Sequence, residues 1–351
     1  MRAAKKRPPV CPVRTGASRC RGAGNHAGHA AHAALPCRGG TAVKLGVTPW
    51  NFGDLSARSL TDQARTAEAL GYDSFWLPEN HFNPGAIPEP LMLLAAVAAG
   101  TQRIRLATTS FLLPVRHPLQ AAEQVAVLDQ LSNGRVILGI GRGYSTAMLQ
   151  AFSVAPGEKR RLFESTLQVM RKAWSGEPVP VGDGQTTVVL DPLPVQRPHP
   201  PLWVAAFGPK ALAQAGRLGL PYLASPMETM TKLEDNFARY DSAAREHGMT
   251  GNASTGARPI MRTVYVSDNA SELRGLRERM ANEVRKLGRL PEEAQTHEWA
   301  ILGDAMEVRD RIDEYRERFA IDYLVVTRLR IPGVPDVSLH ASMAAVAQMA
   351  G

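Results

Sequence analysis

Residues 101–144 read TQRIRLATTSFLLPVRHPLQAAEQVAVLDQLSNGRVILGIGRGY, and the organisation of the whole chain follows from them. An apolar run over residues 103–113, rich in Ile, Leu, Thr and Phe, predicts a strand that is buried on both faces. After a loop bracketed by prolines, apolar residues recur at helical spacing: Leu119, Ala122, Val125, Ala126 and Leu128. Asn133-Gly134 indicates a turn, and residues 135–140 predict a second buried strand. A strand, a helix and another strand in this order form a βαβ unit with parallel strands.

Predicted strands and helices alternate along the rest of the chain. Short apolar runs predict strands at residues 43–48, 73–77, 202–206, 261–266 and 322–327. Helical spacing of apolar residues predicts helices at 60–70, 91–99 and 158–174, one that begins at Gly208-Pro209, and a closing one from Val337. Between residues 176 and 201 a hairpin is expected around 181–190. The alternation favours a parallel α/β barrel, which at 351 residues commonly forms one domain.

The first long helix has recognisable signals at both ends. Ser59 and Asp62 have the spacing of a capping box, so we expect Ser59 to cap the helix at 60–70. Gly71 stands where a C-terminal cap belongs, because glycine adopts the left-handed conformation of such caps at low cost. These signals place the helix between the first two predicted strands.

The excess of basic residues is confined to the first 42 residues. This tail has no Asp or Glu and eight basic residues, namely Arg2, Lys5, Lys6, Arg7, Arg14, Arg19, Arg21 and Arg38. Removing these eight from the chain's 41 Lys and Arg leaves 33, which balance its 33 Asp and Glu. The body at residues 43–351 is therefore neutral, and we expect it to bind neither nucleic acid nor a membrane surface.

The tail also holds every cysteine of the chain, at positions Cys11, Cys20 and Cys37. The body therefore contains neither a disulfide nor a cysteine nucleophile. Because residues 1–42 lack periodicity and large apolar side chains, we expect them to be disordered. A transit peptide, a nucleic-acid arm and a metal-binding tract of cysteine and histidine are three interpretations of this tail. A fourth hypothesis is that translation starts at Val43, which the intact mass of the natively expressed protein would test.

The sequence indicates neither a membrane-spanning segment nor a secretory signal. No apolar stretch approaches the roughly 20 residues that a membrane-spanning helix needs. The charged start is followed by Pro, Gly, Ala and His, and this differs from the apolar core of a secretory signal. We therefore expect a soluble cytoplasmic protein with one domain at residues 43–351.

Four segments in order resemble the luciferase-like monooxygenase family. They are GYDSFWLPENHF at 71–82, ATTSFLLPVRHPLQAAEQVAVLDQLSNGR at 107–135, LGIGRGY at 138–144 and PPLWVAAFGPKALAQAGRLGLP at 200–221. The family comprises flavin-dependent (β/α)8 TIM barrels and includes bacterial luciferase, alkanesulfonate monooxygenases and deazaflavin-dependent oxidoreductases. The resemblance covers residues 43–350, and the block at 107–144 is its most specific part. It implies a luciferase-like TIM barrel with insertions between strands.

The end of the strand at 135–140 is a candidate phosphate site. Active sites of such barrels lie in the loops after the strands. In Gly139-Ile140-Gly141-Arg142-Gly143 the glycines would let the backbone approach a ligand, and Arg142 offers a forked cation. A purely structural use of these glycines is the competing interpretation. The resemblance implies that Gly141, Arg142 and Gly143 bind the cofactor, because the arginine at this place contacts the flavin phosphate in bacterial luciferase.

A second half of the phosphate site is expected at Ala206, Phe207 and Gly208. Here a helix begins after a strand and presents free N–H groups to an anion. Luciferase has side-chain hydroxyls and a carboxylate in this loop, whereas this chain has Phe207, Gly208 and Ala211. Lys210 is either a substitute ligand or a solvated side chain.

The third loop contains Thr109 and Ser110. The resemblance implies that these residues lie under the flavin ring. It also implies a cis peptide between them, a conformation that is rare outside proline.

The fourth loop, Glu79-Asn80-His81, departs from the family. Many relatives have Glu-His-His here, and the first histidine, which is catalytic in luciferase, is Asn80 in this chain. An amide hydrogen-bonds but exchanges no proton near neutral pH, so light emission is in doubt. An acid/base role would pass to His81, for which a structural role is the competing interpretation. Trp50 and Tyr144 are candidates for the substrate pocket or for rim packing.

The resemblance implies a flavin-dependent monooxygenase that uses reduced FMN and oxygen on a small organic substrate. It further implies a separate NAD(P)H:flavin reductase as partner and a homodimer or higher homo-oligomer. One alternative is a deazaflavin coenzyme that moves hydride without oxygen, and another is a flavin-binding relative without turnover. A metal-dependent hydrolase built on Glu79, His81 and His117 is a fourth reading, although this spacing matches no recognised metal motif.

Overall fold

The computed structural model describes residues 42–249 and 257–349, except 287, 289, 292, 329, 330 and 332. Predictions about the basic tail fall on residues 1–41 and so lie outside the described residues. The remainder is described below as one unit, which spans residues 38–351.

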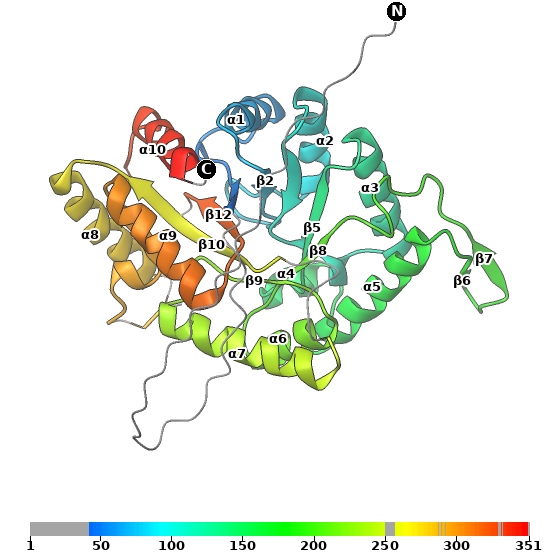
Figure 1. The fold of residues 1–351 in the computed structure, drawn as a ribbon. Coiled ribbons are helices and arrows are strands. Elements are labelled where there is room, and N and C mark those ends of the chain that lie inside the picture. The colour runs from blue at the N-terminus through cyan, green and yellow to red at the C-terminus, as the bar shows by residue number, and fades with distance from the viewer. Residues whose placement is uncertain are drawn as a thin grey trace, which may run out of the picture. The chain divides into compact units, whose positions relative to one another are not determined.

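A curled sheet of parallel strands forms the centre of this unit (Figure 1). Its strands follow the order β11-β10-β12-β1-β2-β3-β5-β8-β9. Their bounds are β1 (Lys44–Val47), β2 (Ser74–Leu77), β3 (Arg105–Thr108), β5 (Val136–Gly141), β8 (Leu202–Ala205), β9 (Tyr222–Leu223), β10 (Pro259–Val266), β11 (Ala300–Gly303) and β12 (Tyr323–Thr327). A short strand, β4 (Phe111–Leu112), also pairs with β5. The parallel sheet and the order of its strands confirm the predicted fold class.

The barrel closes at Ala224, directly after β9, where the chain meets β10. Ala224 forms a parallel bridge with Ile260 of β10. Ala224 N donates to Pro259 O at 3.3 Å, and Met261 N donates to Ala224 O at 3.0 Å. Because β10 also pairs with β12, these bonds join eight strands into a barrel, and β11 extends the second half of β10.

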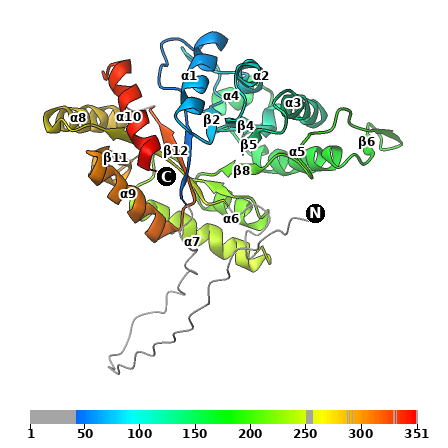
Figure 2. The ribbon, with the colours of Figure 1, turned by 45° about the horizontal axis from the view of Figure 1, so that its top comes forward.

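Helices surround the strands on the outside of the barrel (Figure 2). Their bounds are α1 (Ala57–Ala69), α2 (Pro90–Gly100), α3 (Pro118–Leu131), α4 (Thr146–Ala151), α5 (Lys159–Trp174), α6 (Pro209–Arg217), α7 (Met230–Glu246), α8 (Ala270–Lys286), α9 (Ala305–Phe319) and α10 (Asp336–Met349), with 3-10 turns η1 (Leu113–Val115) and η2 (Thr296–Glu298). In α5, Phe163, Leu167, Met170 and Trp174 recur at helical spacing and are buried against the sheet. Each long helix thus covers the barrel with its apolar face.

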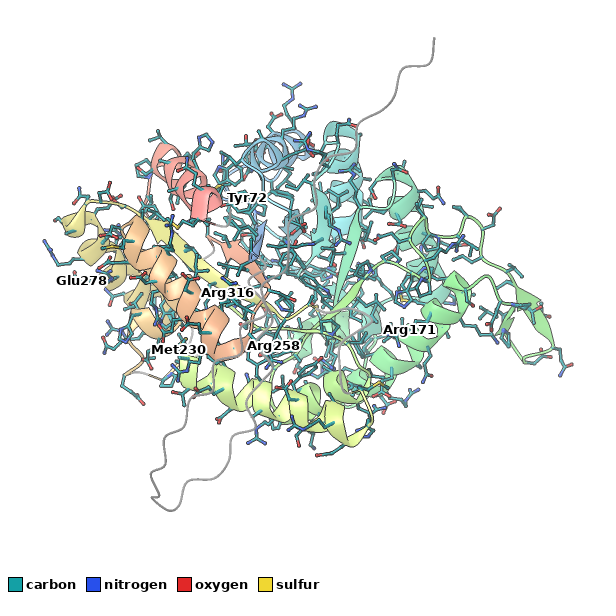
Figure 3. All side chains as sticks on the ribbon, in the orientation of Figure 1. Tyr72, Arg171, Met230, Arg258, Glu278 and Arg316 are labelled. Atoms are coloured by element: carbon teal, nitrogen blue, oxygen red, sulfur yellow. The ribbon has the colours of Figure 1, made fainter. Side chains whose placement is uncertain are left out.

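The inside of the barrel is filled by side chains, which Figure 3 shows on the ribbon. The indole rings of Trp76 and Trp203 stack with centroids 5.1 Å apart, and the Tyr323 ring meets Trp203 edge-on at 4.9 Å. Tyr323 OH lies 2.6 Å from Ser74 Oγ. The barrel is therefore a packed core, and space for a ligand is to be sought at its end.

Most predicted elements are present within a few residues, and three differ. The strand predicted at 103–113 is interrupted, because β3 ends at Thr108 and the chain pairs again only at Phe111. The cap of α1 is Ser56, whose Oγ accepts from Ser59 N at 3.2 Å, so the predicted cap at Ser59 is wrong. The short strands β9 and β11 were not predicted. The hairpin expected around 181–190 is present as β6 (Val179–Val181) and β7 (Thr186–Val188), which pair antiparallel.

Glu68 of α1 fastens the chain that leads from α2 into β3. Its carboxylate accepts three backbone N–H groups, from Gln102 at 3.0 Å, Arg103 at 2.6 Å and Ile104 at 2.8 Å. Burial by itself raises the pKa of Glu68, but these N–H donors outweigh burial and the net shift of the pKa is downward. The fold therefore stabilises the charged form of Glu68.

We expect Glu68→Gln to lower the free energy of unfolding by about 1–3 kcal/mol at neutral pH, because hydrogen bonds to a charged acceptor become bonds to a neutral one. The pKa of Glu68 is lower in the folded than in the unfolded state. Its contribution is therefore complete above the unfolded pKa and is lost as the pH falls through the folded pKa. Urea unfolding at neutral pH and below the ordinary value of 4.5 measures this loss. Glu123→Gln, at an exposed position of α3, is the control, and equal losses from both variants would contradict the prediction.

Candidate active site

Four loops that the sequence marks as functional leave the same end of the barrel. They follow β2, β3, β5 and β8, which are consecutive neighbours in the parallel sheet. Parallel neighbours end at the same edge, so these loops lie side by side. The structure thereby brings together the predicted site residues Asn80, His81, Thr109, Ser110, Gly141, Arg142, Gly143, Ala206, Phe207 and Gly208.

A buried carboxylate, Glu79, organises the loop after β2. Its side chain is fully buried and accepts from Arg116 Nη1 at 2.7 Å and from Leu112 N at 3.0 Å. The Arg116 guanidinium also lies over the Phe111 ring, 3.9 Å from its centroid. The third partner is His81, whose Nε2 lies 2.8 Å from Glu79 Oε1. Arg116 supplies the opposite charge that a buried carboxylate needs.

This carboxylate also determines how His81 is presented. An ionised carboxylate only accepts hydrogen bonds, so Nε2 of His81 must carry the hydrogen that points to Glu79. The imidazole packs against two aromatic rings, with centroids 4.9 Å from Phe152 and 5.7 Å from Phe82, and these two rings also lie 5.7 Å from each other. Phe82 is 71% exposed, so these rings form an apolar wall at the mouth of the barrel.

The neighbouring Asn80 anchors its own loop. Its Oδ1 accepts from Ile87 N at 2.7 Å, and its backbone N donates to Ile87 O at 3.1 Å. His117 is exposed and stands at the N-cap of α3, where its carbonyl accepts from Ala121 N. Within the described parts of the chain, no three His, Cys, Asp or Glu side chains are grouped so that they could hold a metal ion. The hydrolase reading, which needed Glu79, His81 and His117 together, has no support from this geometry.

The peptide between Thr109 and Ser110 is cis, as the resemblance implied. It lies between β3 and β4 and faces the end of β5. A Cβ placed on Gly141 would lie 2.0 Å from Ser110 Oγ, and one on Gly139 would lie 1.9 Å from Thr108 O. Both glycines belong to β5 itself. They are needed so that the neighbouring chain can approach, which favours the structural interpretation of Gly139 and Gly141 that the sequence had left open.

We expect Gly141→Ala to displace Ser110 and to destabilise the protein by about 1–3 kcal/mol, because overpacking a tight contact forces its neighbours to move. Thermal unfolding of the variant measures the loss. Gly157→Ala is the matched control, since nothing lies within 4 Å of a Cβ added there. Equal unfolding temperatures for the two variants would contradict the close contact with Ser110.

Arg142 is held at the end of β5 by neutral groups. Its side chain is buried, and Nε donates to Gln214 Oε1 at 2.5 Å. Nη1 donates to Ala205 O at 3.2 Å, and Nη2 donates to Ala211 O at 3.3 Å. The guanidinium lies over the Phe163 ring, 4.5 Å from its centroid. Because a guanidinium has five N–H groups, two remain beyond these three bonds.

The charge of Arg142 survives this burial. Burial lowers the pKa of Arg142 to about 10, Glu164 raises it, and the nearby Arg160 lowers it. A pKa near 10 keeps the guanidinium cationic at neutral pH. The site thus contains a buried and oriented cation with hydrogen-bond capacity to spare.

The loop after β8 lies beside Arg142. Ala206 is buried, Phe207 is 59% exposed, and Gly208 has a φ of +78° as the residue before α6. Pro209 opens the helix and has no N–H, and Ala211 N donates to Gly208 O at 3.1 Å, so the N–H groups of Gly208 and Lys210 are the ones left for an anion at this turn. A helix N-terminus next to a buried arginine is a suitable anion site.

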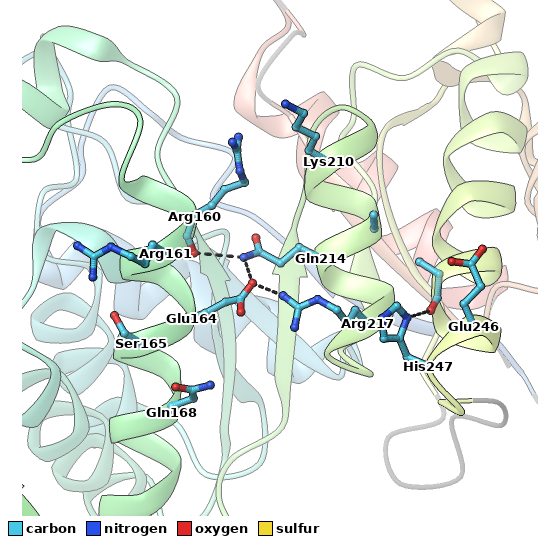
Figure 4. Close-up of a pocket in the computed structure, with 12 residues that line it drawn as sticks. Arg160, Arg161, Glu164, Ser165, Gln168, Lys210, Gln214, Arg217, Glu246 and His247 are labelled. Atoms are coloured by element: carbon cyan, nitrogen blue, oxygen red, sulfur yellow. Dashed lines mark hydrogen bonds and ion pairs between the residues drawn. The ribbon is translucent and has the colours of Figure 1, made fainter.

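Two further cations stand at this edge, and sequence reasoning missed one of them. Arg160 near the start of α5 and Lys210 near the start of α6 are exposed and point to the same side in Figure 4. Below them, a cleft of about 680 Å³ lies between α5, α6 and α7. Arg160 carried no recognisable motif, because its importance comes from its position next to Arg142.

Trp50 and Tyr144, the two candidates for the substrate pocket, differ in their burial. Trp50, after β1, is partly buried, packs against the core, and its backbone N donates to Gln63 Oε1 at 2.9 Å. Tyr144 is 67% exposed and follows Gly143 at the rim. Their contact with a substrate stays a prediction.

Comparison with known proteins agrees with the fold. The sequence profile of the luciferase-like monooxygenase family matches residues 34–321. The uncharacterized protein y4wF of Sinorhizobium fredii is 30% identical over 318 residues, which cover 83% of this chain and 91% of that protein. The chain belongs to the luciferase-like monooxygenase family, whose members include monooxygenases and other oxidoreductases.

Two solved structures share the fold and differ in the cofactor that they bind. The oxygenating constituent of 3,6-diketocamphane monooxygenase from Pseudomonas putida, described in complex with FMN, is 21% identical with a TM-score of 0.74. The match covers 88% of this chain and 98% of that one. An F420-dependent secondary alcohol dehydrogenase is 20% identical with a TM-score of 0.68, covering 88% and 99% of the two chains. In the part of the chain that the structure describes, every helix is too short or too polar to cross a membrane.

Proposed function

We propose that this protein is a flavin-dependent monooxygenase that uses reduced FMN and oxygen on a small organic substrate. One observation carries the proposal: the buried cation of Arg142 lies beside the N-terminus of α6, at the end of the barrel where the four loops meet. A phosphate monoester fits these donors. Arg142 would bind its oxygens through the two remaining N–H groups, and the N–H groups of Gly208 and Lys210 at the start of α6 would complete the site.

The same end of the barrel suits the flavin ring. Thr109 and Ser110, joined by the cis peptide, would support one face of the ring, and Gly141 keeps this support close to β5. Phe82, Phe152 and the imidazole of His81 would limit the access of water from the mouth. When bound, reduced FMN supplies the electrons with which oxygen is activated.

His81 is the residue that we propose for proton transfer. Its Nε2 hydrogen is directed at Glu79, which leaves Nδ1 as the atom that accepts or returns a proton. Asn80, whose Oδ1 is bound to Ile87 N, would contribute its amide N–H groups as donors to a substrate oxygen. Trp50 and Tyr144 would line the substrate pocket.

The second candidate is a deazaflavin-dependent oxidoreductase that transfers hydride. Arg160 and Lys210 favour it, because two exposed cations beyond Arg142 suit a coenzyme with further anionic groups beyond its phosphate. A flavin-binding relative without turnover is the third candidate, suggested by Asn80. We further propose a separate NAD(P)H:flavin reductase, a homo-oligomeric state and a cytoplasmic location.

Anaerobic titration tests the cofactor directly. FMN, reduced FMN, riboflavin and a deazaflavin coenzyme would each be titrated into the full chain, with flavin fluorescence and absorbance as readouts. Tight binding of reduced FMN and weak binding of riboflavin are expected, since the phosphate supplies the anion for Arg142. A preference for the deazaflavin would favour the second candidate, and binding of none of the four would refute the proposal. Oxygen uptake in the presence of reduced FMN then separates turnover from binding alone.

A further inference from the structure

We propose that Gln214 positions the Arg142 guanidinium for the cofactor phosphate without forming an ion pair with it. This inference rests on the proposed function, and it assigns a role to a residue of α6 that lies outside the loops at the mouth. Gln214 would act as a neutral link between Arg142 and a carboxylate that lies behind it. It is a positioning residue, because it acts through Arg142.

Gln214 is buried, and its amide joins two elements that flank the phosphate edge. Its Oε1 accepts from Arg142 Nε at 2.5 Å. Its Nε2 donates to Glu164 Oε1 at 2.5 Å and to Arg160 O at 3.2 Å (Figure 4). The oxygen therefore faces the donor Arg142, and the NH₂ group faces two acceptors on α5. Since both ends of the amide are engaged, the guanidinium is held in one orientation.

The hydrogen bonds from Arg142 through Gln214 to Glu164 place a neutral amide between the cation and the carboxylate. Glu164 also accepts from Arg217 Nη2, so its negative charge has a cationic partner of its own. The groups that bond Arg142 directly are one amide oxygen and two backbone carbonyls, all of them neutral. The guanidinium is thus held by neutral groups, and no directly bonded carboxylate competes with a ligand for it.

A carboxylate in place of the amide would remove this arrangement. Glutamate has the shape of glutamine, but it would form an ion pair with Arg142 and face the carboxylate of Glu164. The negative charge of the glutamate would then cancel part of the attraction between Arg142 and an incoming phosphate, because the guanidinium would already be bonded to a charged acceptor. A hydrogen bond to a charged group contributes about 1.5–3 kcal/mol, which corresponds to a loss of roughly ten- to hundred-fold in phosphate-dependent affinity.

The test compares FMN with riboflavin, which lacks the phosphate. The dissociation constants of both would be measured for the full chain, for Gln214→Glu and for Gln214→Leu. The ratio of the riboflavin to the FMN constant isolates the contribution of the phosphate. We expect Gln214→Glu to lower this ratio roughly ten- to hundred-fold, at an unchanged riboflavin constant. Gln214→Leu removes the bond but adds no charge, so its ratio should fall by less.

Gln168→Glu is the matched control. Gln168 is exposed on α5 and lines the same outer cleft, and the structure shows it apart from the link between Gln214 and Glu164 (Figure 4). Its variant should keep the wild-type ratio. A ratio that Gln214→Glu leaves unchanged, in a wild type that prefers FMN, would overturn the role of Gln214 alone. A wild type without preference for FMN over riboflavin would overturn the proposed phosphate site as well. Should Gln214→Glu fail to fold, an unchanged ratio in Gln214→Leu would overturn the positioning role.

Discussion

Replacing Arg142 by alanine should weaken the binding of FMN by roughly 30-fold to several thousand-fold, while the binding of riboflavin stays nearly unchanged. Truncating one partner of a buried, hydrogen-bonded charge pair costs about 2–5 kcal/mol, and each 1.4 kcal/mol is a factor of ten in affinity. Arg142 is 7% exposed, so water cannot replace the guanidinium easily. Fluorescence titration of both flavins measures the effect.

Lysine at this position provides a graded variant. Arg142→Lys retains a positive charge. It lacks the planar guanidinium, which bonds Gln214, Ala205 and Ala211 and has further N–H groups for a ligand. Its loss of FMN affinity should lie between wild type and Arg142→Ala. Because Arg142 also ties β5 to α6, the unfolding temperature of each variant must be measured beside the titration. An equal loss of affinity for FMN and riboflavin would show that the variant damages the pocket in general, and would contradict a phosphate-specific role.

The second large effect is expected at Glu79 and concerns stability. Glu79→Ala leaves Arg116 largely buried, with side-chain exposure of 10%, and removes its main counter-charge. Breaking a buried ion pair from one side costs about 3–5 kcal/mol. The same substitution removes the acceptor that orients His81, so catalytic turnover should fall as well. Urea unfolding measures the change in the free energy of unfolding.

Glu89 supplies the matched control for this prediction. It also pairs with Arg116, at 3.4 Å, but its side chain is 47% exposed. Exposed pairs contribute only about 0–1 kcal/mol, so Glu89→Ala should have little effect. Equal losses of stability in the two variants would contradict the prediction that burial makes the Glu79 pair the stronger one. A double variant, Glu79→Ala with Arg116→Leu, should lose less than the sum of the single losses, because no uncompensated charge remains.

The parts of the fold that could be predicted are those with a local signal. The helix at Pro118–Leu131 and the strand at Val136–Gly141 follow from apolar periodicity, which depends on residues close in sequence. The strand β9, with two residues, is too short to show any period. The break at Thr109-Ser110 was not predicted from the apolar pattern, because only the short polar stretch 108–110 separates the apolar residues on its two sides and threonine is common in strands. Only the resemblance marked that peptide.

The candidate site was predictable where a motif carries it and not where distant residues meet. The loops at Asn80-His81 and Arg142 carry such motifs. Arg116, by contrast, lies 37 positions from Glu79, and their pairing depends on how β4 and η1 fold back beside β2. Gln214 is 72 positions from Arg142 and looks like an ordinary helical glutamine in the sequence. The supporting residues of the site were missed because no local pattern records a contact between separate turns of a barrel.

The neutral setting of Arg142 has a practical consequence for the purified protein. Inorganic phosphate and sulfate present the same oxygens as a phosphate monoester, so either anion would compete for a guanidinium whose direct partners are neutral. A competing anion at concentration [L] weakens the apparent affinity for FMN by the factor 1 + [L]/Kd and stabilises the fold by RT ln(1 + [L]/Kd). If the proposed phosphate site is right, the choice of buffer salt should change both the melting temperature and the flavin content of a preparation.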